Sequence, residues 1–321
     1  MTTASPPLRV RLFSALRKEP DYSTLTGDRL TEFAERNNRA AASGAGRLIT
    51  GFPDRDAAIA WQDVALPGRS IPVRVLRPTR APDGPLPLVV HVHGGGFVGT
   101  ATQCDWVTSH VAAHLPAVVV SVDHRLLTDE IPLSAAVDDG WDVLGHIVDR
   151  ATDWGIDPER VAVFGESCGA MIAALSAIRA RGTDLRIRAQ VLVNPPTDIT
   201  PAGFALPSMK EYAETPTLTI ERLEMFLRLA APEGVDPRTL SPLHAGDLSG
   251  LPPALVVVPT LDPLADHGRV YVERLRAAGT PAELSEHPKA GHAFLSMPGL
   301  VPAAKDARAR IFAFLAEKLA R

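Results

Sequence analysis

Ser167 lies between two glycines in the stretch GESCG, residues 165–169, and this spacing suits nucleophilic chemistry. Strand-forming residues from Val161 to Phe164 precede it, and an alanine-rich run of helix formers follows it. A serine at such a strand-to-helix turn takes strained backbone angles that expose its hydroxyl, and the flanking glycines prevent a steric clash. We therefore predict that Ser167 is a nucleophile. An N-cap serine on a tightly packed helix is the alternative.

The stretch HGGG at residues 93–96 follows another apolar run and indicates a place for negative charge. Consecutive backbone N–H groups of such a loop can point into one cavity, where they bind an oxyanion. We expect two donors from Gly94 and Gly95 and a third from the backbone N–H of Cys168. A phosphate-binding loop is the competing use of these glycines, but neither its lysine-threonine ending nor a dinucleotide fingerprint follows.

A serine hydroxyl needs a base to remove its proton, and the base needs a carboxylate to orient it. Among ten histidines, His292 falls in a loop between the last predicted strand and the closing helix. Asp262 follows the penultimate strand, which Pro263 terminates. The chain order Ser167, Asp262, His292 is the order that a strand-turn-helix serine site requires. Asp266 is the rival acid, and a helix-start histidine and a helix N-cap are the non-catalytic alternatives for His292 and Asp262.

Metal and redox chemistry have weaker support in the sequence. His91 and His93 share one face of a predicted strand, but no further acid or histidine completes a metal site there. Cys104 and Cys168 are too few for a disulfide framework and lack the spacing of a zinc site. We expect two reduced thiols, no metal and no cofactor.

Alternating strand and helix patterns position these residues and predict a mostly parallel sheet covered on both faces. Nearly continuous apolar runs, typical of strands buried on both faces, follow an opening hairpin. The three-and-four spacing of amphipathic helices appears from Leu133 to Val148 and from Ala304 to Leu319. The predicted strands are Val64 to Leu66, Ile71 to Pro78, Leu86 to Val92, Pro116 to His124, Val161 to Gly165, Ala189 to Asn194, Pro253 to Pro259 and Ala282 to Glu286.

Two segments with helical patterns interrupt this alternation, and we predict that they cap the C-terminal edge of the sheet. The first is residues 1–50, which leaves 51–321 as the core, and the second is an insertion at about 198–235. Surface helices without contact to a site are the alternative. The Phe, Leu and Met content of the insertion favours an apolar acyl group. We expect substrate contacts from Phe97, Phe204, Met209 and Tyr212.

Composition excludes some classes of partner. The chain has 321 residues, of which 45% are hydrophobic and 22% charged, as in ordinary globular proteins. Its net charge of -4 gives no basic excess for nucleic acid. No run approaches 18 apolar residues, and the first residues lack the apolar stretch and cleavage site of a signal peptide. We expect a cytoplasmic protein without an integral membrane segment.

Taken together, the motifs resemble those of the hormone-sensitive lipase family of α/β-hydrolase esterases, from Leu86 to the C-terminus. They are His93 to Gly96, VDHRL at 122–126, GESCG, DPLAD at 262–266 and GHAF at 291–294. The resemblance implies an α/β-hydrolase fold with a mostly parallel eight-stranded sheet, helices on both faces and a helical cap. It assigns Ser167 as nucleophile, His292 as proton carrier, Asp262 as its orienting acid and Gly94, Gly95 and Cys168 as the oxyanion hole. It gives supporting roles to His93, Gly96 and Glu166.

Several positions depart from the family pattern. Glu166 and Cys168 replace the usual Asp and Ala, Ala170 replaces a glycine, His124 replaces a tyrosine, and Asn194 begins an Asn-Pro-Pro run in place of Tyr-Pro. We expect these changes to alter the pocket and the substrate but not the triad.

The resulting functional prediction is a serine carboxylesterase that acts through an acyl-enzyme on small to medium, largely apolar acyl esters. Its partner is a small-molecule ester substrate. The enzyme is expected to act in biosynthesis or detoxification. An acyltransferase or lactone-processing enzyme that uses the same serine and a non-catalytic small-molecule binder are the alternatives. The resemblance also allows a homodimer.

Overall fold

The computed structural model describes residues 5–16, 20–96, 98–128 and 130–320, and it confirms the predicted fold class. Eight strands form one sheet in the order β1-β2-β4-β3-β5-β6-β9-β10. The pairings of β2 with β1 and β4 are antiparallel, and the others are parallel. The strands are β1 (Ala57–Leu66), β2 (Arg69–Pro78), β3 (Leu86–Val92), β4 (Val118–Val122), β5 (Ile156–Glu166), β6 (Ile187–Val193), β9 (Ala254–Leu261) and β10 (Ala282–Gly291).

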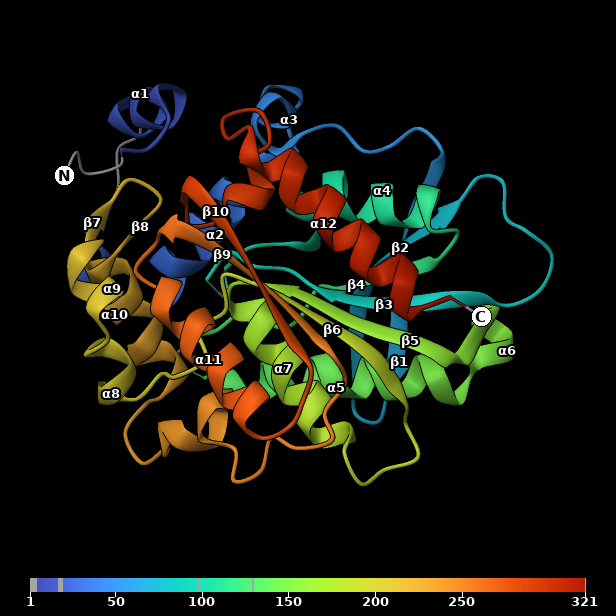
Figure 1. The fold of residues 1–321 in the computed structure, drawn as a ribbon. Helices are drawn as coiled ribbons and strands as arrows, with labels where there is room; N and C mark the ends of the chain where they lie inside the picture. The colour runs from blue at the N-terminus through green and yellow to red at the C-terminus, as the bar shows by residue number, and fades with distance from the viewer. Residues whose placement is uncertain (1–4, 17–19, 97, 129, 321) are drawn as a thin grey trace.

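Helices cover both faces of this sheet (Figure 1). One face carries α4 (Asp105–His114) and α12 (Ala303–Lys318). The opposite face carries α5 (Leu133–Asp149), α7 (Cys168–Ala180) and α11 (Ala265–Ala277), with the short α6 (Ala151–Trp154) after α5. Short 3-10 turns η2 (Ala101–Cys104), η3 (Pro237–Leu240), η4 (Pro242–His244) and η5 (Phe294–Ser296) complete the core.

The central strands are apolar at successive positions because each face of the sheet has its own core. On β3, Val89 packs with the α4 and α12 layer, whereas Val90 packs with the α5, α7 and α11 layer. Val119 and Val120 on β4 divide in the same way. Side chains alternate between the faces of a strand, so a strand covered on both sides needs apolar residues throughout.

Strand ends agree less well with the sequence prediction. β5 begins at Ile156 and not at Val161, and β10 continues to Gly291 and not to Glu286. β10 lies at the edge of the sheet beside β9, and its register shifts between His287 and Gly291. An edge strand is not buried along its whole length, and the last residues of β10 form no apolar run. A prediction that relies on apolar runs therefore ends this strand too early.

The N-terminal helices and the insertion lie at the same end of the molecule (Figure 1). Leu30 and Phe33 of α2 share one buried cluster with Met225 and Phe226 of α10 and with Met171 of α7. The N-terminal elements are α1 (Leu8–Leu16), η1 (Tyr22–Thr24), α2 (Gly27–Ala42) and α3 (Gly44–Thr50). The insertion contains α8 (Pro201–Phe204), α9 (Pro207–Glu211), β7 (Glu214–Thr215), β8 (Leu218–Thr219) and α10 (Ile220–Ala230).

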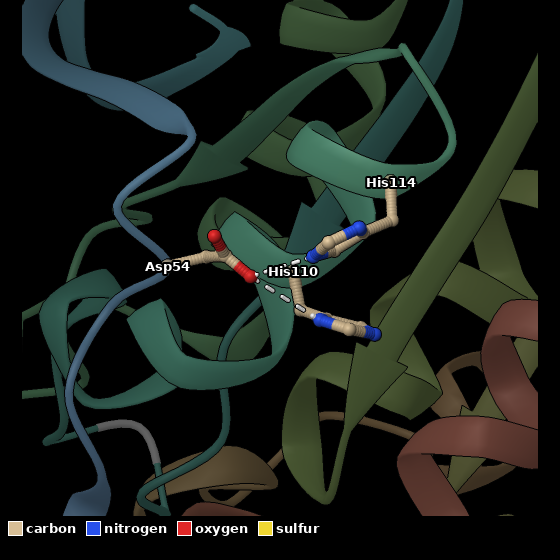
Figure 2. A group of neighbouring side chains, drawn as sticks. All are labelled: Asp54, His110 and His114. Carbon is tan, nitrogen blue, oxygen red and sulfur yellow. Dashed lines mark hydrogen bonds and ion pairs between the residues drawn. The ribbon is translucent and has the colours of Figure 1, made fainter.

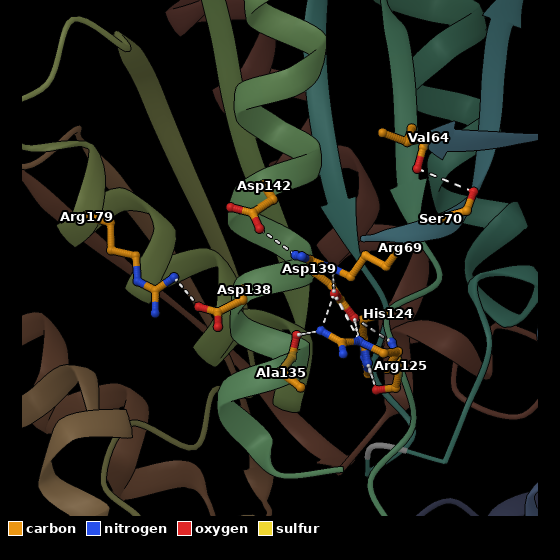
Figure 3. A network of polar contacts seen from close by, with 10 residues as sticks. All are labelled: Val64, Arg69, Ser70, His124, Arg125, Ala135, Asp138, Asp139, Asp142 and Arg179. Atoms are coloured by element: carbon orange, nitrogen blue, oxygen red, sulfur yellow. Dashed lines mark hydrogen bonds and ion pairs between the residues drawn. The ribbon is translucent and has the colours of Figure 1, made fainter. Parts of the chain in front are cut away.

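A buried carboxylate fixes the loop after β4 to α5. Asp139 of α5 is fully buried and accepts hydrogen bonds from Nε and Nη2 of Arg125, at 2.9 and 2.8 Å (Figure 3). Arg69 of β2 donates to the same carboxylate at 3.0 Å. Two guanidinium groups thus offset the desolvation of Asp139. The more exposed pair of Arg179 and Asp138 nearby contributes little by comparison.

In the part of the chain that the structure describes, each helix is too short or too polar to span a bilayer.

Candidate active site

Ser167 occupies the turn between β5 and α7 with a backbone φ of 52° and ψ of -122°, which is strained for a residue with a side chain. The two glycines permit this turn, as predicted. A Cβ at Gly165 would lie 2.2 Å from the carbonyl oxygen of Gly169, and a Cβ at Gly169 would lie 2.1 Å from that of Val92. The Ser167 side chain makes no capping bond to α7, which argues against the N-cap interpretation.

Ser167, His292 and Asp262 meet at the carboxyl ends of β5, β10 and β9. Ser167 Oγ lies 2.9 Å from Nε2 of His292, and Nδ1 of His292 lies 2.9 Å from Oδ2 of Asp262. The other carboxylate oxygen of Asp262 accepts the backbone N–H of Leu264 at 3.0 Å. All three side chains are buried, Asp262 completely. The structure therefore brings together residues 95 and 30 positions apart (262 − 167 and 292 − 262) in a continuous hydrogen-bonded chain.

Asp266, the rival acid, has other partners. Its carboxylate accepts the backbone N–H of Ser208 at 2.9 Å and Nη1 of Arg269 at 2.9 Å. It thus joins α11 to α9 and makes no hydrogen bond with His292. Of the two acids that the sequence offered as partners of His292, Asp262 is therefore the one that contacts the ring.

The glycine loop lies against the serine turn. Gly95 and Gly96 have φ values of 103° and 61° and line a cavity together with Ser167 and Cys168. Gly94 is not among the lining residues: a Cβ there would lie 3.3 Å from Cβ of Ser167 and 3.0 Å from the carbonyl oxygen of Glu166. Gly94 therefore packs behind the serine, and the positions that face the cavity are Gly95, Gly96 and Cys168.

Residues after β4 support the glycine loop. His93 donates from Nδ1 to the carbonyl oxygen of Gly94 at 2.7 Å, and its Nε2 lies 3.4 Å from Oδ1 of Asp123. The same carboxylate oxygen accepts the backbone N–H of Ala101 at 2.7 Å. The ring of His124 stacks on that of His93 at 4.4 Å between centroids. Burial lowers the pKa of His124 to about 4, so this ring is neutral at pH 7.

Glu166 connects the nucleophile turn to the loop that carries His292. It is buried, and its Oε2 accepts a hydrogen bond from the hydroxyl of Ser296, the last residue of η5, at 2.7 Å. Burial raises the pKa of Glu166. Its Oε1 lies 4.0 Å from Nε2 of His91, whose pKa burial lowers to about 3. These contacts agree with a supporting position for Glu166 behind the serine.

The structure also places the residues that the sequence analysis considered for metal and redox chemistry, namely His91 and the two cysteines. His91 Nδ1 lies 2.7 Å from Oγ of Ser121, on the neighbouring strand β4. His91 also lies near Cys104 and Glu166 in a fully buried group. Neither Cys104 nor Cys168 forms a disulfide, and both are buried; burial raises the pKa of Cys104. Burial and a raised pKa make Cys104 a poor nucleophile.

The cavity above Ser167 has an empty volume of about 790 Å³, which includes its opening to solvent. This size accommodates a small-molecule ligand. Of the expected substrate contacts, Phe204 lines the cavity, whereas Met209 and Tyr212 are not among its lining residues. Met209 is buried in the cap. Phe97 lies outside the described residues. The apolar walls are Met171, Ile199, Phe204, Leu218, Leu223, Phe226, Leu227, Ala230 and Leu264.

Helix α10 supplies wall residues that the sequence analysis did not select. Leu223, Phe226, Leu227 and Ala230 follow the three-and-four spacing and face the cavity. The buried residues of this helix also include Leu229, which does not line the cavity. Because apolar side chains occupy both sides of α10, periodicity alone does not identify the side that faces the substrate.

Comparisons with known proteins agree with this geometry. A family model described as the α/β-hydrolase fold matches residues 89–296. Carboxylesterase NlhH of Mycobacterium tuberculosis is 40% identical, with 78% of this chain and 79% of the relative covered. Ethyl acetate hydrolase of Pseudomonas putida is 31% identical, with 81% and 82% covered. An ester hydrolase from the Lake Arreo metagenome, solved with a phosphonate derivative, superposes with a TM-score of 0.85 at 30% identity, with 97% and 98% covered.

Proposed function

Because the chain belongs to the α/β-hydrolase family of the hormone-sensitive lipase type and is a serine carboxylic-ester hydrolase, we propose that Ser167 is its nucleophile and that the reaction proceeds through an acyl-enzyme. One observation carries this proposal: two consecutive 2.9 Å contacts link Ser167 to His292 and His292 to Asp262 at the base of an apolar cavity. A hydroxyl, an imidazole and a carboxylate in this arrangement form the serine-hydrolase triad.

In the first half of the reaction, Nε2 of His292 removes the proton of Ser167 as Oγ attacks the ester carbonyl. Asp262 accepts the Nδ1 hydrogen, which orients the ring and stabilises the imidazolium. The Ser167 Oγ–carbonyl bond forms, and the carbonyl oxygen becomes an oxyanion. Collapse of this intermediate breaks the bond to the alcohol oxygen, which takes its proton from His292.

We assign the oxyanion donors to the backbone N–H groups of Gly95, Gly96 and Cys168. This assignment replaces Gly94 of the sequence-based prediction with Gly96, because Gly95 and Gly96 line the cavity and Gly94 packs behind Ser167. Cys168 is the first residue of α7 and lines the cavity, and the N-terminal end of a helix favours negative charge. Each donor of this kind contributes about 10² to 10³ in rate.

In the second half, water loses a proton to His292 and attacks the acyl-enzyme. The acid leaves, and Ser167 recovers its proton from His292. The apolar walls of the cavity favour small to medium acyl groups without charge. Ethyl acetate hydrolase and carboxylesterase among the relatives support such a substrate class.

Replacement of the serine tests the proposal. Ser167→Ala is expected to lose at least about 10³ in kcat on a p-nitrophenyl acyl ester, because the hydroxyl that attacks the ester carbonyl is removed. Ser176→Ala is the matched control: Ser176 lies on α7, and its hydroxyl donates to the carbonyl oxygen of Ile172 at 2.9 Å. Circular dichroism checks that both variants are folded. A folded Ser167→Ala enzyme with wild-type turnover would refute the assignment.

A further inference from the structure

A second group of chemically competent side chains lies outside the proposed active site. Asp54, His110 and His114 gather at the surface between the segment that precedes β1 and helix α4 (Figure 2). We propose that these three residues bind one divalent transition-metal ion. None of the three lines the cavity at Ser167.

The spacing of the three ligand atoms fits one ion. Oδ2 of Asp54 lies 2.8 Å from Nε2 of His114 and 3.4 Å from Nδ1 of His110, and all three atoms lie within 4.8 Å of one another. Ligands about 2.0 to 2.1 Å from a tetrahedral metal are themselves about 3.3 Å apart. A small rotation of the His114 ring away from Asp54 therefore makes room for the ion.

The backbone presets these ligands. His110 and His114 are four residues apart on α4, so both side chains project from one face of the helix, as in helical zinc sites. Asp54 is fixed from two sides: its backbone N–H donates to Oγ of Ser109 at 2.8 Å, and its Oδ1 accepts the N–H of Asp56 at 3.1 Å. The second oxygen, Oδ2, is thereby directed at the two rings (Figure 2).

The donor set indicates the class of metal. Two imidazole nitrogens with one carboxylate oxygen suit Zn²⁺, Ni²⁺ or Cu²⁺, whereas Mg²⁺ and Ca²⁺ prefer sets made only of oxygen. Three protein ligands leave a coordination position for water. His110 interacts electrostatically with the guanidinium of Arg308. The positive charge of Arg308, whose guanidinium stacks on Trp106 at 3.8 Å, opposes the ion and moderates its affinity.

An ion here would act on stability and not on the ester reaction. Asp54 belongs to the segment between α3 and β1, which joins the N-terminal helices to the sheet. Helix α4 packs on the sheet itself. The ion would therefore hold the base of the N-terminal helices against the core. A ligand that binds only the folded chain raises its melting temperature.

Calorimetric titration of the full, tag-free chain with Zn²⁺ tests the site without any activity measurement. We expect one ion per chain, and we expect His114→Ala to weaken binding at least about tenfold because one of three ligands is lost. At a Zn²⁺ concentration about 100 times the wild-type Kd, the wild-type Tm is expected to rise by about 4 °C, and that of His114→Ala by about 2 °C or less.

Three further variants locate the ion. His146→Ala, which removes a partly exposed helical histidine on α5, is the matched control and should leave binding unchanged. His292→Ala should also retain the ion, which excludes the proposed triad as its site. Loss of binding in Asp54→Asn as well as in His114→Ala supports the proposal. Absence of saturable binding at millimolar Zn²⁺, equal affinity in His114→Ala and wild type, or loss in His292→Ala alone would overturn it.

Discussion

At the scale of single residues, the reactivity of Ser167 depends on which nitrogen of His292 carries the proton. Asp262 is completely buried and accepts from Nδ1, so the lone pair of Nε2 faces Oγ of Ser167. The second oxygen of Asp262 is already occupied by the N–H of Leu264. The carboxylate therefore cannot rotate away from the ring without losing a backbone hydrogen bond.

Exchange of the two candidate acids tests this arrangement. Asp262→Asn keeps the size of the side chain but can present an N–H to His292, which favours the wrong tautomer, and kcat is expected to fall about 10⁴-fold. Asp266→Asn should change kcat little, because Asp266 bonds to Arg269 and Ser208. Steady-state kinetics of both variants on one ester give the comparison. A larger loss of kcat in Asp266→Asn would contradict the assignment of the acid.

Single residues near the serine could be predicted because their constraints are local. The strained turn at Ser167 needs glycine at 165 and 169, and the structure has carbonyl oxygens where each Cβ would lie. The choice between Gly94 and Gly96 could not be predicted in this way. Both are glycines in one short loop, and only the fold of that loop shows which of them faces the cavity.

At the scale of elements, α10 forms one wall of the cavity and contacts the glycine loop. A Cβ added to Gly96 would lie 1.9 Å from the ring of Phe226, so this ring packs directly on the backbone of the loop. The guanidinium of Arg222 lies over the rings of Phe226 and Tyr22, at 5.6 and 5.7 Å from their centroids. Phe226 thus limits the cavity close to Ser167 and links the insertion to the N-terminal segment.

Removal of this ring is expected to change acyl-chain preference. Phe226→Ala enlarges the cavity, and the ratio of kcat/KM for a long acyl ester to that for an acetyl ester should rise about tenfold, since one to two methylene groups gain apolar contact. Leu229→Ala is the matched control, because Leu229 is a buried residue of α10 outside the cavity lining. A p-nitrophenyl ester series from acetyl to decanoyl measures the ratio. An unchanged profile in Phe226→Ala would remove Phe226 from the acyl site.

The main elements of the sheet could be predicted, but the details of the cap could not. Val89 and Val90 face different cores, so β3 reads as one continuous apolar run that periodic analysis detects. The ribbon of β7 and β8 has two residues in each strand, which is too short for a pattern. The face of α10 toward the cavity depends on tertiary packing, and the sequence gives only its periodicity.

At the scale of the whole molecule, three buried histidines make the fold sensitive to acid. Burial lowers the pKa of His91 to about 3 and those of His124 and His267 to about 4. In an unfolded chain the pKa of a histidine is about 6.5. Between these values the unfolded chain binds more protons than the folded one, so the free energy of unfolding decreases as pH falls below about 6.5.

Equilibrium urea unfolding at pH 7 and pH 5 measures this effect. Below about pH 6.5, each buried neutral histidine lowers the free energy of unfolding by about 1.4 kcal/mol for each pH unit. Between pH 7 and pH 5 we therefore expect a loss of roughly 2 kcal/mol for each of these histidines. His124→Tyr introduces the residue usual in the family and removes one of the three histidines. The decrease in the free energy of unfolding between pH 7 and pH 5 should then be smaller by roughly 2 kcal/mol. Equal free energies of unfolding at the two pH values would contradict the neutral burial of these rings.

An acyl-enzyme mechanism requires that Ser167 form a covalent bond with the acyl group of the substrate. An activated phosphonate ester traps such a serine, and intact-protein mass followed by peptide mapping identifies the labelled residue. We expect one phosphonyl group per chain, on Ser167, with parallel loss of esterase activity and no label in Ser167→Ala. A label on a different residue, or full ester turnover by a chain that takes no label at Ser167, would contradict this mechanism.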